Sequence, residues 1–152
     1  MPVIKLETKI KAVKAVVFDL ARNIDLHQIS AKQTKEKAIA GKISGLIELN
    51  ESVTWRAKYF GVYHTLSVKI TKYNKPHHFT DEMISGIFKS FIHEHHFKEE
   101  AGITIMIDVF DYKAPLGFIG SIIDILFLKR YMTKFLSKRN QVIKEYAEKG
   151  LS

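Results

Sequence analysis

The sequence contains no cysteine, which excludes a disulfide framework, a thiolate nucleophile and a cysteine-ligated zinc site. The absence fits a reducing compartment, and we expect a cytoplasmic protein. The longest apolar tract, PLGFIGSIIDILFL at 115–128, is shorter than the roughly 20 residues that span a bilayer and contains Asp124, so we interpret it as a buried helix. The N-terminal residues alternate and carry lysines, unlike a signal peptide.

Internal repeats, low-complexity segments and a Pro/Gly/Ser-rich linker are also lacking, so residues 1–152 are expected to form a single domain with a real hydrophobic core. What is abundant is positive charge: 24 Lys and Arg against 16 Asp and Glu give a net charge of +8. This charge favours anionic surfaces, such as nucleic acid or acidic lipid, but specifies neither. Solubility alone accounts for it equally well.

The apolar residues predict an alternation of strands and helices along the chain. A strand over 3–11 is followed by two short helices within 13–31, and residues 35–51 suggest a short strand with turns. Strands are then expected over 52–60 and 63–73, and over 77–84 after a turn at 74–76. A strand over 87–98 and a partner strand that extends to Asp111 are expected to flank a loop centred on 99–102. Pro115 stands where proline is favoured in a first helical turn, and helical periodicity continues from Leu116 to Lys149.

The first hairpin has one apolar and one polar face. A two-residue turn at Gly61-Val62 would place three apolar residues of one strand opposite three of the other, and these pairs are Val53 with Ile70, Trp55 with Val68 and Ala57 with Leu66. The opposite face then carries Thr54, Arg56 and Lys58. The self-consistent pattern indicates that the apolar face meets the core.

Three histidines in the stretch SFIHEHHFKEE, residues 90–100, are the most conspicuous polar feature. Strand alternation puts His93 and His95 on one face and His96 on the other. A loop centred on 99–102 would set His95 opposite Met106 and His93 opposite Asp108, with Phe91–Phe110 and Phe97–Thr104 as flanking pairs. We expect the His96 face to be the wetter one. If every hairpin had a two-residue turn, the faces would be exchanged and Ile92 would lie on the same side as Trp55. One bulge, for instance at Gly86, would restore the expected faces.

Four segments of the chain form recognisable blocks, and these are SVTWRAKYFG (52–61), FTDEMISGIFKSFIHEHHF (79–97), GITIMIDVFDYKAPLGFIG (102–120) and FLKRYMTKFLSKRN (127–140). They resemble the blocks of a bacterial subgroup of the SRPBCC superfamily, some of whose members are called cell division inhibitors. The superfamily includes START lipid-transfer domains, the birch pollen allergen and polyketide cyclases. The subgroup usually has histidine where this chain has Tyr59, so contacts at that position would differ here.

The resemblance implies an α+β helix-grip fold, in which a curved antiparallel β-sheet wraps around a long C-terminal α-helix and two short helices follow the first strand. It also implies a cavity between sheet and helix that receives a hydrophobic or amphipathic ligand. The expected ligand is a lipid, an isoprenoid or a polyketide-like compound. We expect the ligand to contact Trp55, Tyr59, Phe91, His93, His95, Met106, Asp108, Phe110 and Tyr112.

The pairing of His93 with Asp108 leaves three interpretations open. The two could satisfy each other as a buried polar pair, which is the interpretation we favour. Asp108 could instead orient His93 as a general acid or base for a cyclase or dehydratase. With His95 they could form an open metal site, but the spacing is common by chance. We therefore predict binding rather than catalysis, without a metal or cofactor.

Polar residues elsewhere are interpreted as surface features. His77, His78, His96 and Arg56 are expected to be solvated. A basic stripe on the last helix leaves a peripheral contact with an anionic membrane open, and it comprises Lys129, Arg130, Lys134, Lys138, Arg139, Lys144 and Lys149. The sequence contains no nucleic-acid motif, so nucleic-acid binding is not expected. Nothing in the sequence indicates an oligomeric state.

Overall fold

The computed structural model describes residues 3–59, 61–114 and 122–150. In chain order the elements are β1 (Val3–Ile10), α1 (Lys14–Ala21), α2 (Ile24–Ser30), the short 3-10 helix η1 (Lys32–Thr34), β2 (Lys37–Gly41), β3 (Ser52–Tyr59), β4 (Val62–Asn74), β5 (His78–Ser85), β6 (Ser90–Glu100), β7 (Ile103–Lys113) and α3 (Ile122–Glu148). The expected order of strands and helices is confirmed. The expected helix start at 115–116 lies outside the described residues.

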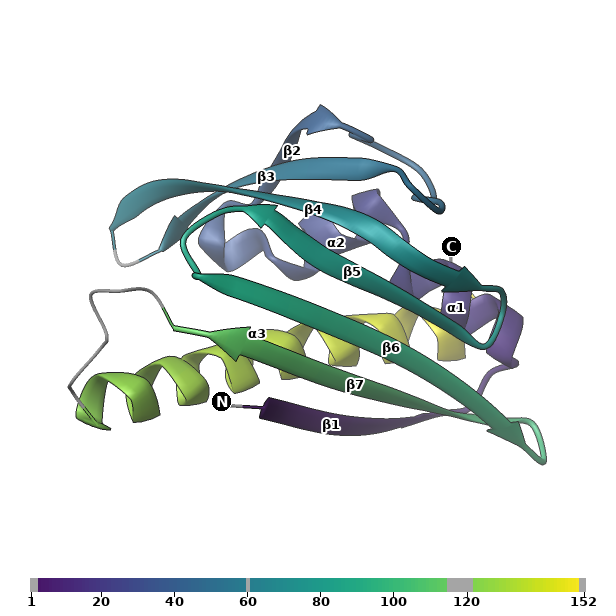
Figure 1. The fold of residues 1–152 in the computed structure, drawn as a ribbon. Helices are drawn as coiled ribbons and strands as arrows, with labels where there is room; N and C mark the ends of the chain where they lie inside the picture. The colour runs from purple at the N-terminus through teal and green to yellow at the C-terminus, as the bar shows by residue number, and fades with distance from the viewer. Residues whose placement is uncertain (1–2, 60, 115–121, 151–152) are drawn as a thin grey trace.

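The seven strands form one antiparallel sheet in the order β1-β7-β6-β5-β4-β3-β2. Figure 1 shows the sheet curving over α3, with α1 and α2 beside the helix. The first strand of the chain, β1, pairs with the last, β7, on the side of the sheet nearest α3. This arrangement is the helix-grip fold that the sequence predicts.

Alternation along the strands decides which side chains meet the helix. Val53, Trp55 and Ala57 of β3 are buried, as are Phe91 and His93 of β6. Residues between them on the other face, among which Ile92 is 44% exposed, meet solvent. The expected inner face is therefore confirmed for both hairpins. Facing residues of β5 and β6 have numbers of the same parity, as in Phe79 with His95 and Asp81 with His93. The irregularity that turns His93 inward therefore lies between these two strands, in the connection that contains Gly86.

The strand partners differ from the expected ones by two residues in both hairpins. The turn between β6 and β7 contains only Ala101 and Gly102, both with positive φ, so His95 pairs with Asp108. The expected partner Met106 was therefore wrong, and His93 faces Phe110 rather than Asp108. Since side chains alternate with a period of two, a shift of two residues changes the neighbours but keeps the face.

A corresponding shift is found in the first hairpin. Val53 pairs with Val68 and Trp55 with Leu66, because the last facing pair before the turn is Tyr59 with Val62, whereas the expected turn at Gly61-Val62 would have made it Phe60 with Tyr63. The expected pairs of Val53 with Ile70 and of Trp55 with Val68 were wrong, although all these residues except half-buried Leu66 are buried. The hairpin therefore still presents its apolar face to the core.

Helix α3 lies along the inner face of the sheet. Its buried residues Leu128, Met132, Leu136 and Ile143 follow helical spacing and form one apolar stripe. At the other end of the core, Phe18 of α1 makes edge contacts with Phe79 and Phe97. Among the described residues, no helix is long and apolar enough to cross a bilayer.

Candidate functional site

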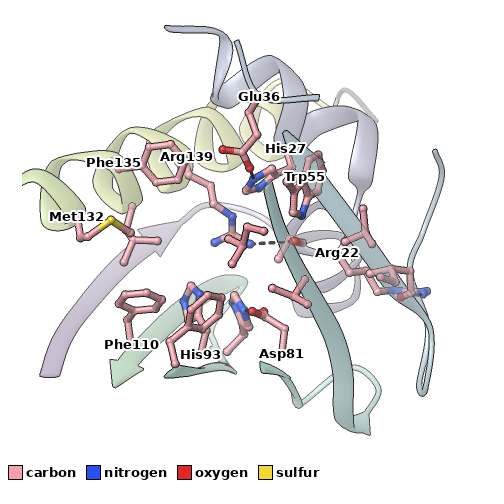
Figure 2. Close-up of a pocket in the computed structure, with 18 of the residues that line it drawn as sticks. Arg22, His27, Glu36, Trp55, Asp81, His93, Phe110, Met132, Phe135 and Arg139 are labelled. Carbon is pink, nitrogen blue, oxygen red and sulfur yellow. Dashed lines mark hydrogen bonds and ion pairs between the residues drawn. The ribbon is translucent and has the colours of Figure 1, made fainter. Parts of the chain in front are cut away.

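A cavity lies between the inner face of the sheet, α3 and the segment that joins α1 to α2. Figure 2 shows its wall, to which α3 contributes Met132, Phe135 and Arg139. The cavity volume is about 130 Å³. One buried water needs about 10–15 Å³ on this measure, and an apolar cavity of about 150 Å³ holds benzene. The space therefore suits a small organic molecule rather than a single water.

The residues expected to contact a ligand divide into three groups. Trp55, Phe91, His93, His95 and Phe110 line the cavity, and all five are buried. Met106, Asp108 and Tyr112 are also buried but do not line it, so the structure places them behind the cavity wall. The side chain of Tyr59 lies outside the described part of the chain.

A cluster of polar side chains forms one part of the wall, and its centre is the carboxylate of Asp108. His93 Nε2 lies 2.9 Å from Asp108 Oδ1, and Asn140 Nδ2 donates to Asp108 Oδ2 over 2.7 Å. His95 Nε2 lies 2.7 Å from Asp81 Oδ2, while its Nδ1 is 3.2 Å from Asp108 Oδ1 without forming a hydrogen bond. The cluster therefore links β5, β6, β7 and α3 beneath the cavity.

Arg139 adds a positive charge to this cluster. Its Nη1 is 3.6 Å from Asp108 Oδ1, and its Nη2 donates to the carbonyl oxygen of Ala21 over 2.9 Å. The side chain is 7% exposed and lines the cavity. The expectation that Arg139 belongs to an exterior basic stripe was therefore wrong. Its neighbours in that stripe, Lys134 and Lys138, are exposed as expected.

The two histidines of the cluster differ in their affinity for a proton. Burial, reinforced by the neighbouring His95, lowers the pKa of His93 below the ordinary value of 6.5. Burial acts in the same direction on His95, but the carboxylates of Asp108 and Asp81 outweigh it and raise the pKa of His95 above 6.5. His95 is thus the histidine of the pair that favours the charged form.

Both carboxylates of the cluster remain ionised. Burial alone would raise the pKa of Asp108, but the hydrogen bond from His93 and the contact with His95 hold it well below its usual range. Burial likewise opposes ionisation of Asp81, and the hydrogen bond with His95 lowers its pKa below 3.8. The guanidinium of Arg139 and His95, whose raised pKa favours a positive charge, lie beside these two carboxylates. Opposite charges in contact reduce the cost of burying them.

A second polar pair lies against Trp55. The ring of His27 is 4.4 Å from the ring of Trp55, and His27 Nε2 is 2.5 Å from Glu36 Oε1. All three residues line the cavity, as do Arg22 and Asn23, so the mostly apolar wall has polar groups beyond the Asp108 cluster. Neither His27 nor Glu36 was expected at the site from the sequence.

In the structure, the carboxylate grouped with the donor atoms of His93 and His95 is that of Asp81 rather than the expected Asp108. Donor atoms of Asp81, His93 and His95 lie within 4.8 Å of one another. However, the Nε2 atoms of both histidines are already engaged by carboxylates, and the guanidinium of Arg139 lies 3.6 Å from Asp108. A cation would have to displace these contacts next to a fixed positive charge. The arrangement therefore favours a proton and hydrogen-bond network.

Two residues that sequence reasoning missed carry recognisable signals. Arg139 falls at the helical spacing set by Met132, Leu136 and Ile143, so a charged residue occupies the apolar stripe. Asp81 shares a strand face with Phe79 by alternation. In both cases a charged residue occupies a position that the periodicity of the element assigns to the core.

Comparisons with known proteins agree on the fold. No protein-family model matches the chain, and no curated protein sequence matches it. Among solved structures, TTHA0849 from Thermus thermophilus superposes with a TM-score of 0.79 at 16% identity, covering 99% of this chain and 100% of that chain. Ginseng major latex-like protein 151 from Panax ginseng gives 0.67 at 15% identity over 96% of this chain and 97% of that chain.

A third solved structure is the di-domain ARO/CYC StfQ from the steffimycin biosynthetic pathway. It gives a TM-score of 0.76 at 9% identity, and the match covers 97% of this chain and 51% of that chain. The chain thus spans about half the length of StfQ. At these low identities the three likenesses establish a shared fold.

Proposed function

From the helix-grip fold, shared with a latex-like protein and with an ARO/CYC protein, we propose that this chain binds a hydrophobic small molecule between its sheet and α3. The observation that carries the proposal is the apolar cavity of about 130 Å³ with a polar cluster in its wall. Apolar lining supplies affinity, and a few fixed polar groups orient a ligand. The latter role falls to His93, His95 and Arg139.

The charge balance of the cluster narrows the ligand class. When His95 is protonated, the form that its raised pKa favours, His95 and Arg139 balance the charges of Asp81 and Asp108. An anionic ligand would add an uncompensated buried charge, whereas a hydroxyl or carbonyl group needs only a hydrogen bond. The ligand is therefore an apolar molecule with a neutral polar end, such as a lipid alcohol, an isoprenoid or a polyketide-like ketone.

The size of the cavity sets the scale of the affinity. A buried aromatic ring system removes about 150–250 Å² from water, which contributes about 4–6 kcal/mol at about 25 cal/mol per Å². This corresponds to a Kd between about 1 mM and tens of micromolar. A tighter ligand must extend through the mouth of the cavity to bury more surface.

A cavity-filling variant tests the proposal. Val68 lines the cavity from β4, and Val68→Phe fills it, so calorimetric titration with naphthol should show binding to the wild type and none to the variant. Val109→Phe makes the same change on the outer face of β7 and should leave binding intact. Equal binding by wild type and Val68→Phe would refute a ligand site in this cavity. Naphthalene sulfonate should bind more weakly than naphthol, because it is anionic.

A cyclase or dehydratase acting on a polyketide-like carbonyl compound is the second candidate. The observation that favours it is the contact between His93 and Asp108: because Asp108 is ionised, His93 Nε2–H donates to it and Nδ1 retains a lone pair. Neutral His93 in the cavity wall could then accept a proton from the carbon beside a carbonyl group.

The two candidates separate at His93. With a poly-β-ketone thioester as substrate, the enzyme hypothesis requires product formation by the wild type, detected by mass spectrometry, and its loss in His93→Gln. A carrier would show no product with either protein. In both cases His93→Gln should still bind naphthol, because the apolar wall remains.

A further inference from the structure

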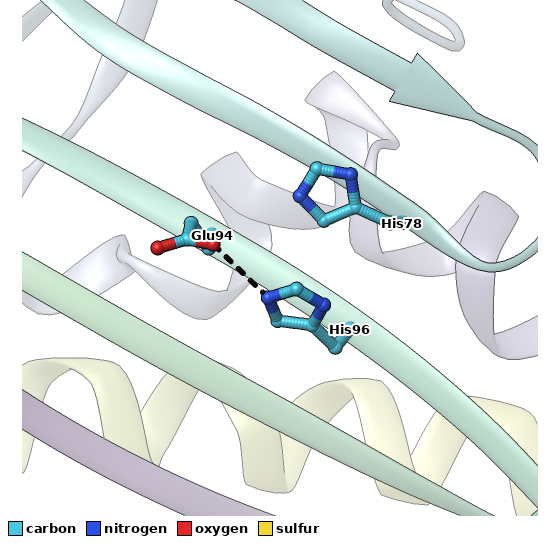
Figure 3. Close-up of side chains that lie close together, drawn as sticks. All are labelled: His78, Glu94 and His96. Carbon is cyan, nitrogen blue, oxygen red and sulfur yellow. Dashed lines mark hydrogen bonds and ion pairs between the residues drawn. The ribbon is translucent and has the colours of Figure 1, made fainter.

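The outer face of the sheet carries a second group of donor side chains, directly behind the cavity wall. His78 of β5 pairs across the strands with His96 of β6, and Glu94 is the next outward residue of β6. One donor atom from each of the three residues lies within 4.8 Å of the others. Figure 3 shows the three side chains turned toward one another on adjacent strands.

Contacts within this group fix the orientation of its rings. His96 Nε2 is 3.2 Å from Glu94 Oε1, and the rings of His78 and His96 stack with centroids 4.6 Å apart. His78 Nε2 is 2.8 Å from the hydroxyl of Thr80, whose side chain is buried. The donors are thus held by the sheet, and His96 and Glu94 remain partly exposed, with side-chain values of 38% and 43%.

We propose that His78, Glu94 and His96 form a binding site for a divalent transition metal ion, with Zn²⁺ the best match. Two imidazole nitrogens and one carboxylate are the ligands that zinc uses in open sites, where a fourth position holds water. Three protein ligands from two strands would let the metal bridge β5 and β6. The hydrogen bonds of Glu94 and Thr80 to the histidines are those that a bound ion would replace.

One positive charge lies near the site. Lys72 of β4 acts electrostatically on His78 and would repel a bound cation. Replacing Lys72 with Gln should therefore tighten metal binding by a few-fold.

Calorimetric titration of the full chain with ZnCl₂ tests the site. The wild type should bind one Zn²⁺, and His78→Ala, His96→Ala and Glu94→Gln should each weaken binding by about tenfold or more, since loss of a ligand costs at least as much as loss of a supporting contact. His77→Ala is the matched control, because His77 is the adjacent histidine, is exposed and lies outside the group. It should bind as the wild type does.

Two further measurements make the result specific. Zn²⁺ should raise the melting temperature of the wild type but not that of the double variant His78→Ala/His96→Ala, because only a native-state site stabilises the fold. His93→Asn, which alters the inner set of donors, should leave zinc binding unchanged. Absence of stoichiometric binding by the wild type, or equal affinity in the double variant, would overturn the proposal. Zinc lost only with His93→Asn would place the ion in the cavity instead.

Discussion

At the scale of single residues, two adjacent inward-facing histidines have opposite proton affinities. The rings of His93 and His95 are only 3.9 Å apart, so two charged imidazoles would repel each other. Asp81 contacts His95 alone, while Asp108 contacts both. The additional carboxylate explains why His95, rather than His93, favours the proton.

This asymmetry predicts a stability maximum near pH 6.5. His95 has a raised pKa, so its stabilising effect is present below about pH 6.5 and is lost as pH rises through its folded-state pKa. His93 has a lowered pKa, so its effect is present above about pH 6.5 and is lost as pH falls toward its folded-state pKa. Urea unfolding between about pH 5 and 9 should show the free energy of unfolding decreasing on both sides.

Single substitutions can assign the acid and the alkaline slope of the free energy of unfolding to individual histidines. His95→Asn should flatten the alkaline slope, and His93→Asn should reduce the acid slope without abolishing it, because His78 also has a lowered pKa. An alkaline slope that persists in His95→Asn would contradict the assignment.

At the same scale, sequence reasoning identified the histidines but not the network around them. His93, His95 and Asp108 were predictable because strand alternation assigns a face to each residue. Arg139 was assigned to the surface because it lies among exposed lysines. A hydrogen bond from a helix arginine to the carbonyl oxygen of Ala21, 118 residues earlier in the chain, depends on tertiary packing that local pattern does not encode.

At the scale of elements, the two-residue turn between β6 and β7 determines which side chains become partners. Ala101 has a φ of 54° and Gly102 a φ of 78°. A non-glycine residue in the left-handed region costs about 1–2 kcal/mol, and Asn tolerates it better than Ala. The turn therefore contains a position that is not optimal for stability.

Ala101→Asn should accordingly raise the free energy of unfolding by up to about 1 kcal/mol, because Asn-Gly is a preferred sequence for such turns. Urea denaturation measures the change. Ala40→Asn, at an exposed strand position in β2, serves as the control and should give no gain, since Asn is depleted in strands. Equal effects of the two substitutions would indicate that turn conformation is not responsible.

The same turn shows why faces were predictable and partners were not. The pattern of apolar residues in β6 and β7 repeats every two residues, so it fits registers that differ by two equally well. Only the turn distinguishes them, and the sequence EEAG allows both a two-residue and a four-residue loop. The structure selects Ala101-Gly102, which brings His95 rather than His93 opposite Asp108.

At the scale of the whole molecule, the cavity between the sheet and α3 provides room for a ligand at the expense of side-chain packing in the core. Leu136 and Ile143 are both buried on α3, at 4% and 2% exposure, but only Leu136 lines the large cavity. The two positions therefore allow packing loss and cavity size to be varied separately.

Leu136→Ala and Ile143→Ala should each lower the free energy of unfolding by about 2–5 kcal/mol. Only Leu136→Ala should improve binding of a three-ring alcohol such as anthracenol, because only that change enlarges the ligand space. Unfolding in urea and calorimetric titration provide the two readouts. Improved anthracenol binding by Ile143→Ala would show that the ligand occupies another part of the core.

Along β6, odd-numbered and even-numbered side chains lie on opposite faces of the sheet. His93 and His95 point inward, whereas Glu94 and His96 point outward. A single-residue insertion or deletion inside this strand would exchange the two faces and place a glutamate in the interior. Homologous chains should therefore accommodate length differences at the ends of β6 and never within it.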